Sequence, residues 1–189
     1  MAHIPLMVNL RGRLATVIGG GKIAARRVRT LCEAGAQVTI VAPEITPTLM
    51  ERVNQGVLHW HRKPFEPGDL DKAWVIVAAT DNKATNRAVA EAAGSHCLVN
   101  VVDDSSLGNF HVPVSLNRGK LTFAVSTGGA SPILARRIRE DLARQYDETW
   151  GEKVEQLYQL RERLKKSEIR EQDRHQRLVD GVEEMFKKE

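Results

Sequence analysis

The chain has few cysteines and few aromatic residues. Its 189 residues include two cysteines, and only 5% are aromatic. Cys32 and Cys97 cannot build a disulfide framework or a paired Cys-x-x-Cys metal site, and each lies in an apolar context typical of a buried thiol. We therefore expect a protein of a reducing compartment, the cytoplasm, that needs neither disulfides nor a structural metal.

Long apolar runs are also missing. No stretch of about 20 apolar residues occurs, so we expect no transmembrane helix, and the N-terminal residues lack the basic and apolar segments of a secretory signal. With 42% hydrophobic residues, 28% charged residues and a formal net charge of +4, the composition is that of a folded globular protein that could bind an anion. Residues 161–189 interleave acidic and basic side chains without an aromatic platform, which argues against nucleic-acid binding.

Strand-like and helix-like segments alternate over the first 112 residues. Strands are predicted at 14–18, 37–41, 58–61, 74–79 and 98–102. Helices are predicted at 22–34, from the Thr46-Pro47 N-cap pair to Gly56, and at 82–93. This alternation is typical of βαβ units, and it predicts a Rossmann-type α/β fold in which helices cover both faces of a parallel sheet.

The pattern changes after residue 112. Runs at 114–116 and 121–125 flank a turn over 117–120 and predict a hairpin, and Ser131-Pro132 begins a helix to about residue 143. From Asp147 onward the chain is helical and highly charged. Two apolar stripes there must pack against something, and a dimer partner or the sheet domain would serve: Val154, Leu157, Leu160 and Leu164, then Leu178, Val182 and Met185. We therefore expect three parts: 1–112, a small α+β region at 113–145, and a helical domain at 146–189.

A glycine-rich turn follows the first predicted strand. Residues 19–24 fit the pattern G-x-G-x-x-G/A, in which Gly19 permits a tight turn and Gly21 lets the backbone approach a diphosphate. Ala24 is small enough for close packing of the helix on the sheet. Because a strand precedes this turn and a helix follows it, the sequence predicts a dinucleotide-binding site at the start of that helix.

Two further segments could contact the dinucleotide. Glu44 follows the second strand two or three positions later than the usual ribose-binding acid, so it either reaches the ribose or is a solvated loop carboxylate. The choice between NAD and NADP therefore stays open. Thr80 ends the strand at 74–79 and could bond the dinucleotide, although Asp81 and Asn82 could simply cap the next helix.

Candidate acid–base residues follow the strand at 98–102. Asp103 and Asp104 are adjacent, so their side chains should point to opposite sides and not share a proton. Either carboxylate could be catalytic or an ordinary loop acid. His111 is a second candidate proton carrier, or a structural histidine.

A second loop rich in backbone donors covers residues 126–132, including Thr127 and Gly128, and precedes a helix that carries Arg136 and Arg137. Backbone amides with guanidinium groups one to two turns further on suit a ligand rich in carboxylates. The alternative is an ordinary capped helix with a solvated basic face. His59 and His61 alternate on a predicted strand without a third ligand, so no metal site is expected.

Taken together, these landmarks resemble the precorrin-2 dehydrogenase family, which includes the N-terminal half of bifunctional siroheme synthase. The resemblance covers essentially the whole chain, most firmly residues 4–145. It rests on Pro5-Leu6, Leu10-Arg11-Gly12-Arg13, Ile18-Gly19-Gly20-Gly21, Ala34-Gly35-Ala36, Ala78-Ala79-Thr80-Asp81, Asn100-Val101-Val102-Asp103, Phe110 with Pro113, and Ala124 to Pro132.

The resemblance implies an enzyme that uses NAD to oxidise precorrin-2 to sirohydrochlorin in siroheme biosynthesis. It implies a homodimer formed through the region 113–145, and it assigns the critical carboxylate to Asp103, with His111 as our second candidate base. Dinucleotide contacts carry over to Lys22, Ile23, Pro43 and Glu44. Some family members also insert ferrous iron, so the alternatives are a sirohydrochlorin ferrochelatase and a non-catalytic NAD-sensing module.

Overall fold

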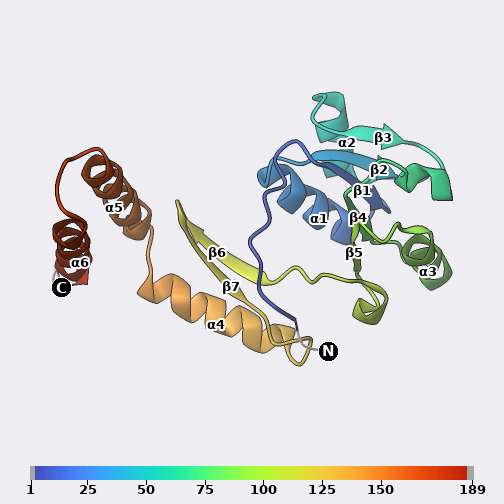
Figure 1. Ribbon diagram of the computed structural model, residues 1–189. Coiled ribbons are helices and arrows are strands. Elements are labelled where there is room, and N and C mark those ends of the chain that lie inside the picture. The colour runs from blue at the N-terminus through green and yellow to red at the C-terminus, as the bar shows by residue number, and fades with distance from the viewer. Residues whose placement is uncertain (1–2, 187–189) are drawn as a thin grey trace. The chain divides into compact units, whose positions relative to one another are not determined.

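A parallel sheet of five strands forms the centre of the first part of the chain (Figure 1). In the computed structural model, which describes residues 3–186, the chain divides into two units, Met1–Val112 and Pro113–Glu189. The strands of the first unit are β1 (Leu14–Ile18), β2 (Gln37–Val41), β3 (His59–His61), β4 (Val75–Ala78) and β5 (Leu98–Val101). They lie in the order β3-β2-β1-β4-β5 and all neighbouring pairs are parallel, so the predicted Rossmann-type sheet is confirmed.

Helices cover both faces of this sheet because its strands are apolar on both sides. On one face, α1 (Lys22–Glu33) and α2 (Pro47–Asn54) pack their apolar residues against alternate residues of β1, β2 and β4. On the other face lie α3 (Lys83–Ala92) and the short 3₁₀ helix η1 (Pro67–Leu70). Every residue of β4 is buried, as expected for a strand inside a sheet covered on both faces.

The order in which successive strands join the sheet reverses between β1 and β4. From β1 the chain proceeds outward through β2 and β3, then returns to add β4 and β5 on the other side. Because all strands are parallel, the segments that follow them lie along one edge of the sheet. Ligands of open α/β sheets bind at this edge, beside the point of reversal.

Thr46 is a partial exception to the predicted helix caps. It occupies the N-cap position of α2, as expected, but its side chain makes no capping hydrogen bond. Its hydroxyl is buried and has no partner among the described residues, while its backbone N–H donates to the carbonyl of Gly20 at 2.9 Å. Thr46 therefore holds the glycine turn in place through a backbone hydrogen bond and not through its side chain.

The second unit begins with an antiparallel hairpin of β6 (Val114–Arg118) and β7 (Leu121–Val125). Arg118 pairs with Leu121, so the turn contains only Gly119 and Lys120 and is shorter than predicted. Gly119 has a φ of +57°, which allows this two-residue connection. The helix α4 (Pro132–Gln145) follows, and the hydroxyl of Ser131 caps it by accepting from the Leu134 N–H at 3.1 Å.

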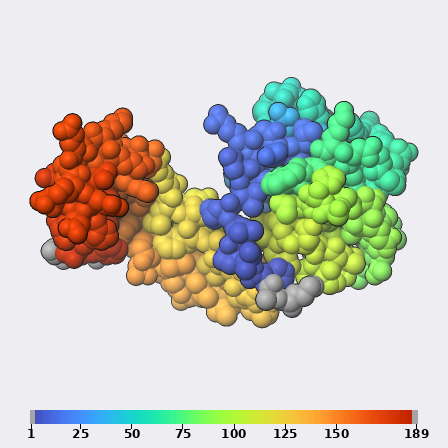
Figure 2. Space-filling model, viewed as in Figure 1, coloured from blue at the N-terminus to red at the C-terminus, as the bar shows by residue number. Residues whose placement is uncertain are grey.

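The last two helices, α5 (Thr149–Lys165) and α6 (Glu171–Phe186), pack against each other. Gly181 of α6 faces Leu157 and Leu160 of α5, and a β-carbon there would lie 3.1 Å from Leu160 Cδ2. The first apolar stripe thus packs against α6, a partner that was not among those predicted. In Figure 2 the atoms of these two helices form one continuous body. None of the described helices is long and apolar enough to span a membrane.

A row of aromatic rings joins the elements of the second unit. The ring centroids of Phe123 and Tyr146 are 4.7 Å apart, those of Tyr146 and Trp150 are 5.0 Å apart, and those of Trp150 and Phe186 are 5.2 Å apart. These residues belong to β7, the end of α4, α5 and α6. Such tilted and edge-on pairs are favourable arrangements for aromatic rings.

Candidate functional site

The glycine turn between β1 and α1 lies tightly against its neighbours. Gly19 has a φ of +118° and donates its N–H to Val41 O at 3.0 Å. A β-carbon at Gly19 would clash with the carbonyl of Ala79, and one at Gly20 would overlap the carbonyl of Glu44. Gly21 differs, because a β-carbon there would meet no atom within 4 Å. The turn is therefore held in place at its first two glycines and open at its third.

Helix α1 begins at this open position. Gly21 is the N-cap and has no side chain, so no side-chain cap covers the first N–H groups of the helix. The first turn carries no acidic residue, which leaves the positive end of the helix dipole unopposed there. Exposed Lys22 and Ile23 follow Gly21. Open space beside uncapped amides at a helix start is the kind of site that binds a diphosphate, and the binding of a dinucleotide here stays a prediction.

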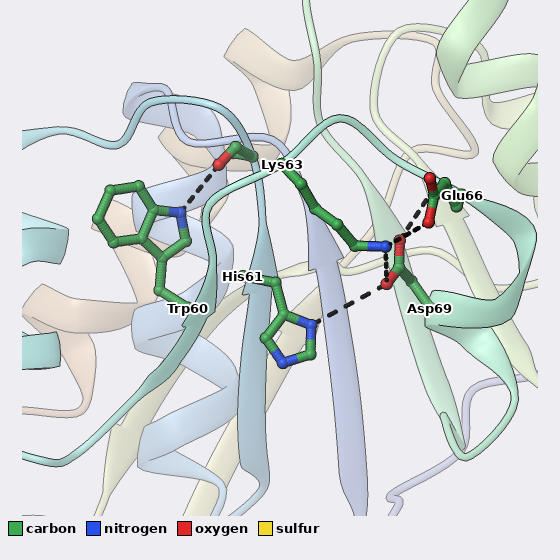
Figure 3. A network of polar contacts seen from close by, with 6 residues as sticks. Trp60, His61, Lys63, Glu66 and Asp69 are labelled. Atoms are coloured by element: carbon green, nitrogen blue, oxygen red, sulfur yellow. Dashed lines mark hydrogen bonds and ion pairs between the residues drawn. The ribbon is translucent and has the colours of Figure 1, made fainter.

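The segment after β2 forms one side of this turn. The indole Nε1 of Trp60 donates to Ala42 O at 2.9 Å, and the N–H of Ala42 donates to His61 O at 3.2 Å. Figure 3 shows the Trp60 indole pointing toward that carbonyl. Pro43 and Glu44 follow and are exposed. The Glu44 side chain is therefore held on a fixed backbone beside the glycine turn.

Basic and acidic groups after β3 form a closed network (Figure 3). Lys63 Nζ lies 2.6 Å from Glu66 Oε2 and 3.0 Å from Asp69 Oδ1, and the Asp69 side chain is only 6% exposed. These two carboxylates raise the pKa of Lys63. His61 Nδ1 lies 4.0 Å from Asp69. Lys63 is thus engaged by two acids, and among the described residues no cluster of three or more His, Cys, Asp or Glu could hold a metal ion.

Thr80, Asn86 and Asp103 form a second network at the ends of β4 and β5. Asn86 of α3 is 1% exposed, and its Nδ2 donates to Asp103 Oδ1 at 2.7 Å. The N–H and hydroxyl of Thr80 both donate to Asn86 Oδ1, at 3.1 and 2.7 Å. Asn82 caps α3 by accepting from two backbone N–H groups. The Thr80 hydroxyl also lies 3.0 Å from Asn82 O, so both donors of Thr80 already have partners within the protein. Its contact with a dinucleotide stays a prediction.

Asn86 is a site residue that was not predicted from the sequence. The available signal was its position on α3, three residues before Val89, which is fully buried. Residues three apart lie on the same helix face, so a polar side chain at position 86 had to be buried and therefore had to be hydrogen-bonded.

The neighbouring carboxylates have separate roles. The side chain of Asp104 accepts from the Ser106 N–H at 3.0 Å and from its hydroxyl at 2.6 Å, and so caps the 3₁₀ helix η2 (Ser105–Leu107). These hydrogen bonds lower the pKa of Asp104. Asp103 instead faces Asn86. The two acids do not form a pair that shares a proton, in agreement with the alternation expected for adjacent residues.

His111 lies at the end of a loop that returns to β5. Within this loop the side chain of Asn109 bonds the backbone of Val99 and Cys97, both at 2.8 Å. The ring centroids of His111 and His3 are 4.3 Å apart, with the two ring planes tilted by 41°. Among the described residues, no hydrogen bond joins His111 to Asp103. The structure therefore leaves the role of His111 as a prediction.

The loop before α4 in the second unit is closed by Thr127. Its hydroxyl oxygen accepts from the Ser131 N–H at 3.0 Å. Gly128 faces open space, and Arg136 is exposed on α4. Arg137 Nε lies 3.5 Å from Asp141 Oδ1, with the Arg137 side chain 66% exposed. The arginines are accessible to an anionic ligand, and their binding of one stays a prediction.

Comparisons with known proteins identify the family. Residues 6–114 match a family described as putative NAD(P)-binding, and residues 118–145 match the sirohaem biosynthesis protein central family. A precorrin-2 dehydrogenase of Priestia megaterium is 35% identical over 182 residues, which cover 96% of this chain and 90% of that protein. The chain belongs to the precorrin-2 dehydrogenase family. Its first unit is an NAD(P)-binding domain.

Further relatives agree with this assignment. A precorrin-2 dehydrogenase of Bacillus subtilis is 36% identical over 84% of this chain and 98% of that protein. A siroheme synthase of Salmonella typhi is 40% identical over 88% of this chain, but the match spans only 36% of that longer protein. The solved structure of SirC, a precorrin-2 dehydrogenase, superposes with a TM-score of 0.83 at 35% identity and covers 94% of this chain and 88% of that chain.

Proposed function

We propose that this chain oxidises precorrin-2 to sirohydrochlorin and uses NAD as the hydride acceptor. The observation that carries the proposal is the match to precorrin-2 dehydrogenases over nearly the full length of both chains. The glycine turn supports it, because Gly21 leaves space beside uncapped helix amides in a fold that otherwise fills the turn tightly.

The first unit would bind the dinucleotide along the edge of the sheet. The amides that follow Gly21, at Lys22 and Ile23, would bind the diphosphate, and Pro43 and Glu44 would contact the ribose. The Glu44 carboxylate would accept hydrogen bonds from ribose hydroxyls but would repel a 2′-phosphate. The charge of Lys63 is already paired with two carboxylates, so it is not free to bind a 2′-phosphate. These features favour NAD over NADP. When bound, NAD supplies the carbon that accepts the hydride.

The reaction removes one hydride and one proton from the macrocycle. Asp103 would take the proton, because its carboxylate is exposed and is held in place by Asn86. His111 is the second candidate base. The remaining contribution of the protein would be to position the two reactants. This lowers the barrier because the entropic cost of bringing them together is met by binding.

The second unit would bind the carboxylate-rich substrate and a second copy of the chain. Thr127 and Gly128 lie in the loop that begins α4, and Arg136 and Arg137 offer accessible guanidinium groups for carboxylates. We assign residues 113–145 as the dimerisation region of a homodimer and residues 146–189 as a helical domain. The two free cysteines, one of them buried, suit the reducing cytoplasm.

An anaerobic absorbance assay tests the proposal. The protein is mixed with precorrin-2 and either NAD or NADP, and the spectrum of sirohydrochlorin is followed together with that of the reduced dinucleotide. We expect sirohydrochlorin and NADH to form in equal amounts, faster with NAD than with NADP. Dinucleotide binding without any spectral change would contradict the proposal and favour the NAD-sensing module. Iron insertion into sirohydrochlorin without dehydrogenation would favour the ferrochelatase.

A further inference from the structure

Asn86 is buried in the first unit, and every donor and acceptor of its side-chain amide is hydrogen-bonded. The residue is 1% exposed, so its amide must be hydrogen-bonded to be tolerated there. Its Oδ1 accepts from the N–H and the hydroxyl of Thr80, and its Nδ2 donates to Thr80 O at 3.1 Å and to Asp103 Oδ1 at 2.7 Å. All the hydrogen-bonding capacity of the amide is used on these two residues.

The backbone of Thr80 determines which way the amide faces. Its N–H can only donate and its carbonyl can only accept, so the Asn86 oxygen must face the N–H and the Asn86 nitrogen must face the carbonyl. The second hydrogen on that nitrogen then points to Asp103. The Asp103 carboxylate therefore faces a fixed donor that cannot be exchanged for an acceptor by rotation of the amide.

The scaffold that holds Asn86 is rigid at both ends. One turn earlier, Asn82 caps α3, and one turn later Val89 is fully buried against the sheet. Thr80 and Asp103 lie two residues beyond the ends of β4 and β5, which are neighbouring parallel strands. Asn86 thus ties the carboxylate that follows one strand to the backbone that follows the next.

We propose that Asn86 is a positioning residue that orients Asp103 for proton transfer. The inference rests on the proposed function. The bond from Asn86 uses Oδ1 of Asp103, and within residues 3–186 no group donates to Oδ2. One carboxylate oxygen is therefore anchored and the other remains available to the substrate. A base held in this way keeps its lone pair directed at one place, and small displacements of a reacting group cost large factors in rate.

The test is a set of variants at positions 86 and 103. Asn86→Asp keeps the size of the side chain and the acceptor for the Thr80 N–H, but it removes the donor to Asp103 and to the Thr80 carbonyl. Asn86→Ala removes the whole interaction. We expect both to lower kcat by about 10- to 100-fold, while the KM for precorrin-2 and the Kd for NAD change by less than about threefold, because the amide is buried and all its hydrogen bonds are made within the protein.

The decisive measurement repeats Asn86→Asp in an Asp103→Asn background, with single-turnover rates at high enzyme concentration. The double variant exchanges donor and acceptor between positions 86 and 103, so it restores that one hydrogen bond but not the bond to Thr80 O, and it leaves no carboxylate at position 103. If Asn86 acts through Asp103, Asn86→Asp causes less than a threefold further loss in this background. An equal loss in both backgrounds, or an unchanged kcat in the single variant, would overturn the proposal.

Asn82→Ala is the matched control. It removes the cap of the same helix without touching Asp103, so it should lower resistance to urea while kcat stays near the wild-type value. A loss of kcat in Asn82→Ala as large as in Asn86→Ala would show that stability of α3 alone matters, and would overturn the proposal. Failure of the proposed function gives different results: no turnover by the wild-type protein, or full turnover by Asp103→Asn alone.

Discussion

Gly20 lies directly against the backbone of Glu44, and a β-carbon at Gly20 would overlap the Glu44 carbonyl oxygen. The adjacent Gly21 faces open space. These two positions in one turn therefore have different reasons to be glycine. At Gly20 the fold excludes a side chain, whereas at Gly21 the fold admits one.

The first prediction compares alanine at these two positions. Gly20→Ala must displace the backbone after β2, so we expect it to lower the free energy of unfolding by roughly 3 kcal/mol. Gly21→Ala meets no atom and should cost at most about 1 kcal/mol, as a poorer N-cap. Urea denaturation followed by circular dichroism measures both. Equal stabilities of the two variants would contradict the close contact at Gly20.

The second prediction concerns Gly21→Asp. Gly21 has a φ of −79°, which any residue adopts, and aspartate is a better N-cap than glycine, so we expect the free energy of unfolding to rise by roughly 0.3 kcal/mol. The same carboxylate would occupy the space proposed for the diphosphate and repel it. Isothermal titration with NAD should show at least a tenfold loss of affinity. Unchanged affinity would place the diphosphate elsewhere.

The third prediction separates the adjacent carboxylates. Asp103→Asn should lower kcat by about 100-fold or more, because general-base catalysis typically contributes that factor, and should leave the Kd for NAD unchanged. Asp104→Asn is the matched control, since Asp104 caps η2 and does not bond Asn86. It should keep kcat within about threefold of wild type. Loss of activity in Asp104→Asn, with activity retained in Asp103→Asn, would show that Asp104 and not Asp103 is the base.

The fourth prediction concerns stability in acid. Hydrogen bonds from Ser106 lower the pKa of Asp104, and those from Thr149 lower the pKa of Asp147. An acid whose pKa is lower in the folded state stabilises the fold above its unfolded pKa, and this stabilisation is lost as the pH falls through the folded value. We therefore expect urea resistance to decline below about pH 4.

Asp147→Asn checks this cause. Asparagine cannot titrate, so the variant should be less stable than wild type at pH 7 and should lose less stability on acidification. Urea midpoints measured at intervals between pH 7 and pH 2.5 give both slopes. A variant with the same slope as wild type would mean that other carboxylates carry the acid sensitivity.

The alternating half of the chain could be predicted because its signals are local and repeated. β-branched runs, terminal glycines and N-cap residues each restrict the backbone within a few residues, and Asn82 and Ser131 cap the helices they were expected to begin. Thr46 shows the limit of such signals. Its position was predicted, but whether its hydroxyl bonds the helix depends on the packing around it, and there it has no described partner.

Long-range partners were less accessible to sequence reasoning. An apolar stripe on α5 requires a partner but does not specify which, and the partner is α6, where Gly181 makes room for Leu157 and Leu160. Likewise, the sequence places Asp103 after a strand without indicating what holds it. Asn86 is 17 residues earlier, on a helix whose contact with the end of β5 depends on how the sheet is assembled.

The aromatic row of the second unit also has a spectroscopic consequence. The chain has three tryptophans. Trp60 and Trp74 belong to the first unit, while Trp150 lies between Tyr146 and Phe186 in the second. Trp60 is bonded to Ala42, beside the proposed ribose site, so its fluorescence would respond to nucleotide. Trp150 would instead report whether the last two helices remain docked, and the two units thus carry separate intrinsic optical labels.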